Sequence, residues 1–248
     1  MDAPIQVSPA EPRQRWRVVY SRSLDAPQLG QRDQLAAWED ALAAGDLPIA
    51  GLDRHPARAR IVFAAPLGVG VPAERELADL FLTERRSIAE VRHALAGRLP
   101  PGHTLVDLHD VWLGAPALPG QVVAAEYRAE IIAPGSAALD RELLSDAASR
   151  LMAAASLPRA RDRGGRMVKY DLRPLLADID IRAVVGPAAT ARVVEGRICV
   201  RFDPERGAGR PEEVLAALAE SAGVDLAFAS LVRERVVLAS GDVGGQGL

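Results

Sequence analysis

The order of apolar patterns in this chain predicts an α+β fold of two tandem ferredoxin-like lobes, each a split βαβ unit with a mainly antiparallel sheet. The first half alternates strand-like and helix-like periodicity in the order β-α-β-β-α-β, and the second half repeats that order. The length of 248 residues points the same way, because one core seldom grows so large and two lobes of about 120 residues are expected.

Local patterns justify the elements of the first lobe. In the run RWRVVYSR, Trp16, Val18 and Tyr20 share one face at strand spacing, opposite Arg15, Arg17 and Val19. Ser87 followed by Glu90 forms a capping box that predicts the start of the second helix. The six elements are expected at 15–22, 31–44, 58–65, 76–82, 87–99 and 103–113.

A short Pro/Gly-rich segment, 114–120, predicts a linker, after which the pattern restarts. Pro211 is a favoured first-turn residue and marks the start of the last helix. The second series is expected at 121–132, 137–154, 178–185, 191–203, 210–222 and 224–238, with an additional extended stretch at 166–171. The lobes are therefore placed at 15–113 and 121–239, between a disordered N-terminus (1–14) and a flexible tail (240–248).

Composition restricts the function classes. A net charge of −3 and a pI near 5.9 argue against a protein that coats nucleic acid without specificity, although a local basic patch is compatible with them. Cys199 is the only cysteine. An iron–sulfur cluster or a thiolate zinc site needs several thiolates, so no cofactor and no metal is expected.

The same features predict the location. One cysteine excludes an internal disulfide, which fits a reducing compartment, and we expect a cytoplasmic protein. The N-terminus lacks the apolar core of a signal peptide, and no apolar run reaches the about 18–20 residues that span a bilayer. No membrane partner is expected.

Eight short motifs follow one another in an order that is typical of one family. They are LGQRD (29–33), DLPIAG (46–51), HPARARIVFAAPLGVG (55–70), AERELADLFL (73–82), LPPGHTLVD (99–107), AEYRAEI (125–131), VKYDLRPLL (168–176) and GRPEEVLAAL (209–218). In this order they resemble the radical-SAM-linked protein family. Its members are encoded beside, or fused to, radical S-adenosylmethionine (SAM) enzymes, and their own biochemical role is not established.

The resemblance implies partnership rather than chemistry. A protein that is linked to a radical SAM enzyme, yet lacks cluster cysteines, is expected to be an accessory or substrate-handling component. The chain departs from the family at Gln31, where a histidine is usual, at Ala43 and Ala44, where paired arginines are usual, and at 51–55, where a longer polar loop is usual. If those polar residues bind a ligand in the family, this member lacks part of that site.

The strongest candidate site is the segment RARDRGGRMVKYDLRP. Its basic residues are Arg159, Arg161, Arg163, Arg166, Lys169 and Arg173. Arginine forks suit phosphates, and the Gly164-Gly165 pair lets backbone N–H groups approach an anion, so we predict an RNA-binding loop for tRNA or rRNA. The alternative is a solvated hairpin turn whose arginines pair with acidic residues elsewhere.

Secondary candidates are Asp33, Arg60, Asp171 and His109. Lys169 is the only lysine among 30 basic residues, and in an extended strand it alternates onto one face with Asp171 and Arg173. That spacing also permits a purely structural pair between Asp171 and Arg173.

Two further groups of polar residues have a structural and a functional interpretation. His103, Asp107 and His109 are expected on one face of a strand, too far apart to share a metal and more simply its solvated face, although His109 remains a candidate acid–base group. Asp33, Glu74, Glu76 and Asp79 are the second group, because paired carboxylates suit acid–base work or Mg²⁺ binding. More simply, Asp33 is expected to interact favourably with the dipole of the helix that it starts. The carboxylates of Glu74, Glu76 and Asp79 are expected on a solvated strand face.

Together these patterns predict an accessory protein that is linked to a radical SAM enzyme and binds RNA in RNA modification or processing. A metal-independent RNA-processing or RNA-modifying enzyme that uses His109 or Lys169 is the alternative, and a structural interaction module is a third.

Overall fold

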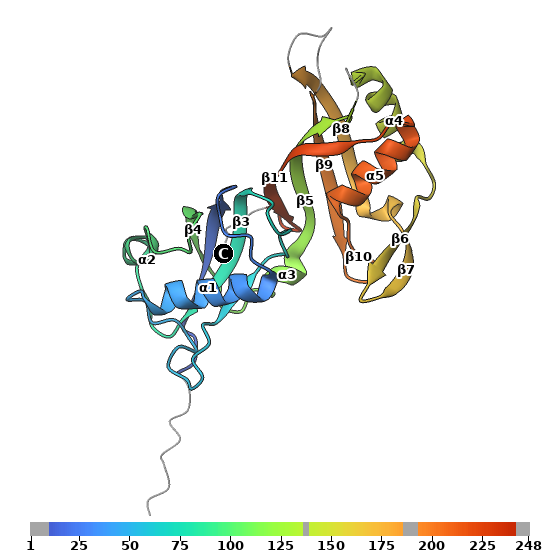
Figure 1. Cartoon of the computed structure of the whole chain (residues 1–248). Helices are drawn as coiled ribbons and strands as arrows, with labels where there is room; N and C mark the ends of the chain where they lie inside the picture. Colours follow the sequence, from blue (N-terminus) through green and yellow to red (C-terminus); the bar gives the residue numbers. More distant parts are fainter. Residues whose placement is uncertain (1–9, 136–138, 186–192, 242–248) are drawn as a thin grey trace, which may run out of the picture. The chain divides into compact units, whose positions relative to one another are not determined.

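The first strand carries different chemistry on its two faces. In the computed structural model, which describes residues 10–135, 139–185 and 193–241 (Figure 1), β1 (Gln14–Arg22) places Trp16, Val18 and Tyr20 in the hydrophobic core, as predicted. The chain divides into two compact units. The N-terminal unit comprises residues up to Val122 together with those from Leu238 onward, and the C-terminal unit comprises Val123–Val237.

The N-terminal unit has the predicted β-α-β-β-α-β order. Its elements are β1, α1 (Gln31–Ala43), β2 (Ile61–Phe63), β3 (Ala73–Leu82), α2 (Ile88–Leu95) and β4 (His103–Val111). The strands lie in the order β4-β1-β3-β2, and each neighbouring pair is antiparallel. This is the split βαβ arrangement, so the predicted topology is confirmed.

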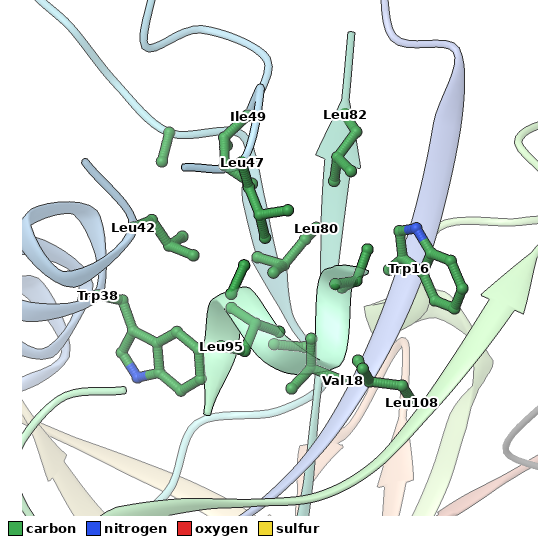
Figure 2. Close-up of a cluster of buried hydrophobic side chains, with 14 of the residues drawn as sticks. Trp16, Val18, Trp38, Leu42, Leu47, Ile49, Leu80, Leu82, Leu95 and Leu108 are labelled. Atoms are coloured by element: carbon green, nitrogen blue, oxygen red, sulfur yellow. The ribbon is translucent and has the colours of Figure 1, made fainter. Parts of the chain in front are cut away.

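Both helices of this unit cover the same face of the sheet. Trp38 and Leu42 of α1 and Leu95 of α2 join Val18 and Leu80 of the sheet in one buried cluster (Figure 2). The capping box that starts α2 is confirmed, because the Glu90 amide donates to the Ser87 hydroxyl at 3.3 Å. Periodicity therefore predicted the core-facing residues Trp16, Val18 and Tyr20 of β1 and Trp38 and Leu42 of α1 correctly.

The C-terminal unit repeats the topology. Its matching elements are β5 (Val122–Ile132), α4 (Arg141–Ala153), β8 (Leu176–Val185), β9 (Val193–Asp203), α5 (Pro211–Ala222) and β11 (Ala227–Leu238). The strand order is β11-β5-β9-β8, with a short β10 (Gly207–Ala208) beside β9. The α+β class and the mainly antiparallel pairing of the strands are as predicted.

One insertion distinguishes the C-terminal unit. Between α4 and β8 the chain forms a separate two-stranded hairpin of β6 (Pro158–Arg163) and β7 (Arg166–Asp171), followed by the short 3-10 helix η1 (Arg173–Leu175). The prediction recognised only the second strand, because RARDR has no alternation of apolar and polar residues.

Several boundaries differ from the expected ones. β2 is limited to three residues, α2 ends before Gly97, which has a φ of +69°, and α3 (Leu118–Gln121) begins within the expected linker. Near the N-terminus, the Arg13 amide donates a hydrogen bond to the carbonyl of Leu82 in β3. The end of the segment that was expected to be disordered is therefore bound to the sheet. Residues 1–9, 136–138, 186–192 and 242–248 lie outside the described residues.

A bulge in β4 separates the two histidines that were expected to share a face. The pairing with β1 passes directly from Asp107 to Leu105, so one residue of β4 is left unpaired. His103 therefore lies on the helix-covered side with Tyr20, and His109 lies on the opposite side with Asp107. The expectation of one shared face is wrong.

The face of β1 and β3 opposite the helices holds a buried ion cluster. Asp79 is fully buried and accepts hydrogen bonds from Arg15 Nε at 2.9 Å and Arg17 Nε at 2.9 Å. Glu76 is also buried, with 1% of its surface exposed, whereas Glu74 is exposed. The prediction of a solvated carboxylate face is therefore wrong for Asp79 and Glu76.

Candidate functional site

The Arg/Gly segment folds as the β6–β7 hairpin. Gly164 and Gly165 form its turn with φ values of +63° and +87°, which favours a tight two-residue connection. Arg159 pairs with Tyr170 and lies on the same face as that ring. Lys169 pairs with Ala160 and lies on the other face. The basic residues whose side chains the structure describes are therefore divided between two faces and the following 3-10 helix.

The inner face of the hairpin is bound to α5. Arg159 forms an ion pair with Glu220, and the Arg161 guanidinium lies 4.9 Å from the Tyr170 ring centre. The Tyr170 hydroxyl is hydrogen-bonded to Glu213. Burial, and then the Glu213 charge, raise the pKa of Tyr170 to about 12 against the opposing effect of the two arginines. Arg159 and Tyr170 thus attach the hairpin to α5, and Arg161 packs on Tyr170 within the hairpin.

Arg173 and Asp171 close the base of the hairpin. The Arg173 guanidinium donates to the carbonyl of Met152 at 2.8 Å and to that of Leu176 at 3.0 Å. The Asp171 carboxylate accepts the backbone N–H of Leu157 at 2.7 Å and that of Arg173 at 2.9 Å. These two bonds lower the pKa of Asp171. Both side chains hold the chain path between α4 and β8.

Two basic side chains of the hairpin remain exposed. Arg166 and Lys169 lie on its surface beside Met167, which is 63% exposed, and within the described residues neither basic side chain has an ion-pair partner. The side chain of Arg163 lies outside what the structure describes. We call Arg166, Met167 and Lys169 the hairpin tip.

A second arginine-rich surface lies in the N-terminal unit, on the loop between α1 and β2. Two hollows, of about 370 Å³ and about 480 Å³, share Arg54 and Arg60 in their linings. We call them together the Arg60 groove, whose basic lining residues are Arg54, His55, Arg58 and Arg60. Of these, only Arg60 was a candidate from sequence.

The loop of the groove is closed by backbone hydrogen bonds. The Arg58 amide donates to the Gly51 carbonyl at 2.9 Å, and the Arg60 amide donates to the Ala50 carbonyl at 2.8 Å. Gly51 has a φ of +90°, and a Cβ at this position would lie 2.2 Å from the Arg58 carbonyl oxygen. Only glycine allows this close approach.

Arg60 is stacked on a buried ring. Its guanidinium lies 4.1 Å from the centre of the Phe81 ring, while its other face is exposed. Arg54 is also exposed, and no ion pair involves Arg54 or Arg60 in the described part of the chain. Arg58 instead pairs with Glu39 at 3.0 Å. The groove thus offers two arginines that can bind an anion, one of them with a flat stacking face.

The remaining candidates lie apart. Asp33 is exposed in the first turn of α1, and half-buried His109 has its Nε2 atom 3.4 Å from the Asp107 carboxylate. Hydrogen bonding to the Leu108 amide chiefly lowers the pKa of Asp107. Across residues 10–135, 139–185 and 193–241, no three His, Cys, Asp or Glu side chains gather as a metal site.

Residues 15–201 match the model of a family described as "Uncharacterized protein conserved in bacteria (DUF2344)". The chain belongs to this family. No functionally curated protein matches this DUF2344 protein. Among the helices that the structure describes, none has both the length and the apolar surface needed to cross a membrane.

Solved structures similar to the DUF2344 protein include a Cbf5-Nop10-Gar1 complex, with 11% identity and a TM-score of 0.48 over 88% of this chain and 49% of the other. The archaeal box H/ACA sRNP Nop10-Cbf5 complex gives 12% identity and a TM-score of 0.47 over 89% and 47%. The chain spans about half the length of these relatives. Similarities at this level carry no argument about function.

Proposed function

We propose that this DUF2344 protein is a cytoplasmic RNA-binding accessory protein that works with a radical SAM enzyme in RNA modification or processing. The observation that carries the RNA-binding part is the Arg60 groove. A guanidinium that is stacked on Phe81 keeps its outer face for a nucleobase and its N–H edge for a phosphate. The neighbouring Arg54 adds a second cation to the same groove.

The hairpin tip supports the same proposal from the other unit. Arg166 and Lys169 are exposed on β7, and Met167 adds an adaptable apolar surface. Each unit thus has a cationic surface of its own that can contact the phosphates of a polyanion. The radical SAM partner rests on the motif resemblance, and the single cysteine of this chain would leave all cluster chemistry to that partner.

The test is the salt dependence of RNA binding. Fluorescence anisotropy would measure the affinity for tRNA and rRNA fragments between about 50 and 200 mM salt, where each lost single-strand phosphate contact reduces the log–log slope by about 0.7. The double variant Arg54→Ala/Arg60→Ala should reduce the slope by about 1.4. Arg75→Ala, an exposed arginine of β3 outside the groove, is the matched control and should leave it unchanged.

Two results would contradict the proposal. RNA affinity that is absent, or that does not depend on salt, removes the RNA-binding part. Turnover of RNA by the purified protein alone, lost in His109→Ala or Lys169→Ala, would favour the enzymatic alternative. The partnership is tested separately, by asking whether the tagged protein co-purifies with an iron–sulfur protein that cleaves SAM.

A further inference from the structure

Two small cavities lie along one face of α1 in the N-terminal unit. The larger, of about 220 Å³, is lined by Gln31 and Gln34 together with Tyr20 and Phe63. The smaller, of about 80 Å³, is lined by Gln34 again and by Trp38. Gln31, Gln34 and Trp38 stand at i, i+3 and i+7, so one helix face supplies polar groups to both cavities.

Aromatic rings line both cavities and form one wall, Tyr20 and Phe63 in the larger cavity and Trp38 in the smaller one. The Tyr20 and Trp38 ring centres are 4.8 Å apart, and those of Trp38 and Phe63 are 5.6 Å apart, both with an edge-to-face geometry. His103 extends the group, with its ring 5.7 Å from that of Tyr20. Because Tyr20 and Trp38 are almost completely buried, this wall is held rigidly by the core.

Buried polar atoms in this wall lack partners. Trp38 is fully buried, yet its indole Nε1 has no hydrogen-bond partner among the described residues, although a buried indole N–H is normally bonded. In Figure 2 this nitrogen lies on the edge of the ring that is turned away from Leu80. The smaller cavity therefore has an unused donor in its wall.

His103 contributes an unused acceptor to the same cavity. Its Nδ1 lies 3.1 Å from the Pro101 carbonyl, which can only accept, so Nδ1 carries the proton and Nε2 presents a lone pair. Nε2 is buried without a partner among the described residues. Burial, with a smaller contribution from the Arg22 charge, lowers the pKa of His103, so the ring is neutral at pH 7.

The linings select an uncharged, planar ligand. Among the described residues, no carboxylate or lysine lines either cavity, and the Arg22 guanidinium is bound to the backbone carbonyls of Gly68 and Val71. Gln31 and Gln34 each offer an amide donor and acceptor, and neither side chain is hydrogen-bonded within the described residues. Drug-sized ligands occupy about 300–1,000 Å³, so 220 Å³ suits a single ring system rather than a whole nucleotide.

We propose that these cavities bind one nucleobase, whose edge is hydrogen-bonded by Gln31 and Gln34 and whose ring packs against Tyr20 and Phe63. Glutamine amides pair well with base edges, and aromatic walls hold unstacked bases. The inference rests on the proposed RNA binding and deepens it, since it adds base recognition to the phosphate contacts of the arginines. A base of a bound RNA and a free nucleoside present the same chemistry.

The experiment titrates the full-length protein with adenosine, guanosine, cytidine and uridine, and separately with ten-nucleotide homopolymers of each base. Fluorescence in a Trp112→Phe background reports on Trp16 and Trp38, because Trp112 is 72% exposed and would dominate the signal. Gln34→Ala should weaken the preferred base by about 3- to 10-fold, the value of one hydrogen bond, while the salt dependence of RNA binding stays unchanged. Gln31→Ala, at an exposed position, should act in the same direction.

Gln28→Ala removes an exposed amide outside both linings and should change nothing. Nucleoside binding that weakens in Gln34→Ala supports the proposal with a free base, and a homopolymer preference that disappears in Gln34→Ala supports it with a base presented by RNA. The proposal is overturned if no nucleoside binds and no homopolymer preference depends on Gln34 and Gln31. If RNA binding is then still salt-dependent, the proposed function stands without the base site. If nucleosides bind but RNA does not, the base site stands and the proposed RNA-binding function is removed.

Discussion

Neutralising Asp79 should destabilise the N-terminal unit more than any surface substitution. Asp79 is fully buried and accepts four hydrogen bonds, two from Arg15 and two from Arg17, which are 2% and 1% exposed. In Asp79→Asn the shape is kept, but two buried guanidinium groups lose the carboxylate charge that both of them bind. Breaking a buried ion pair in this way costs about 3–5 kcal/mol.

That cost is a large share of the about 5–15 kcal/mol that a folded domain has. With a urea dependence of about 2 kcal/mol per molar, the unfolding midpoint should fall by about 1.5–2.5 M. Tryptophan fluorescence follows the N-terminal unit selectively, because the three tryptophans, Trp16, Trp38 and Trp112, all precede Val123.

The matched control is Asp25→Ala, which removes an exposed carboxylate from the same unit and should change stability by no more than about 0.5 kcal/mol. A loss below about 1 kcal/mol in Asp79→Asn is what an exposed ion pair gives. It would refute the reasoning, because it would mean that water reaches the cluster and compensates the arginines.

Three further substitutions test other contacts. Gly51→Ala should destabilise the N-terminal unit and weaken RNA binding, because the added Cβ meets a backbone carbonyl at 2.2 Å, whereas Gly97→Ala, at a φ of +69° with no atom within 4 Å, should cost much less. The folded-state pKa of Tyr170 is raised, so its contribution to stability is lost as pH rises from about 10 to about 12. Tyr170→Phe should therefore reduce this loss of stability, which urea unfolding monitored by circular dichroism would measure. His103→Gln should reduce the loss of stability below about pH 6.5, measured by tryptophan fluorescence, because the lowered folded-state pKa favours the fold only above the unfolded value.

Each of these has an outcome that contradicts it. An equal loss of stability in Gly51→Ala and Gly97→Ala would show that the loop of the Arg60 groove can adjust to accommodate a Cβ at position 51. An unchanged alkaline stability profile in Tyr170→Phe would mean that its hydroxyl is not held in the folded state. For His103→Gln, the contradicting result is the same acid sensitivity as the wild type.

The topology was predictable because the local periodicity of apolar residues indicates the type of each element and its buried face. Trp16, Val18 and Tyr20 at strand spacing, and Trp38 and Leu42 at helical spacing, each mark the side of an element that must leave water. The repeat of this order in the second half then predicted the second unit. What periodicity measures is the burial of apolar side chains, and there it succeeded.

The errors concern features that depend on a partner strand. The unpaired residue in β4 changes the face of His103 relative to His109, and nothing in HTLVDLHD reveals it, because a bulge is set by the register with β1. A carboxylate in a strand is expected on a solvated face, because a charge is buried only when it is paired. The ion pairs of Asp79 with Arg15 and Arg17 are formed across two strands, so the local sequence does not reveal them.

The same limit explains why counting arginines along the chain gave an incomplete account of the candidate site. Arg161 and Arg60 are both stacked on an aromatic ring, at 4.9 Å and 4.1 Å. The ring under Arg161 belongs to the hairpin face that is bound to α5, so Arg161 is buried, with 8% of its surface exposed, and serves the packing of the hairpin. The ring under Arg60 lies in the sheet, so the opposite face of that guanidinium is left to solvent. A stacked arginine is accessible to a ligand only where the face of its guanidinium away from the ring is in solvent. Arg60 meets this condition and Arg161 does not, although Arg161 belongs to the segment with more arginines.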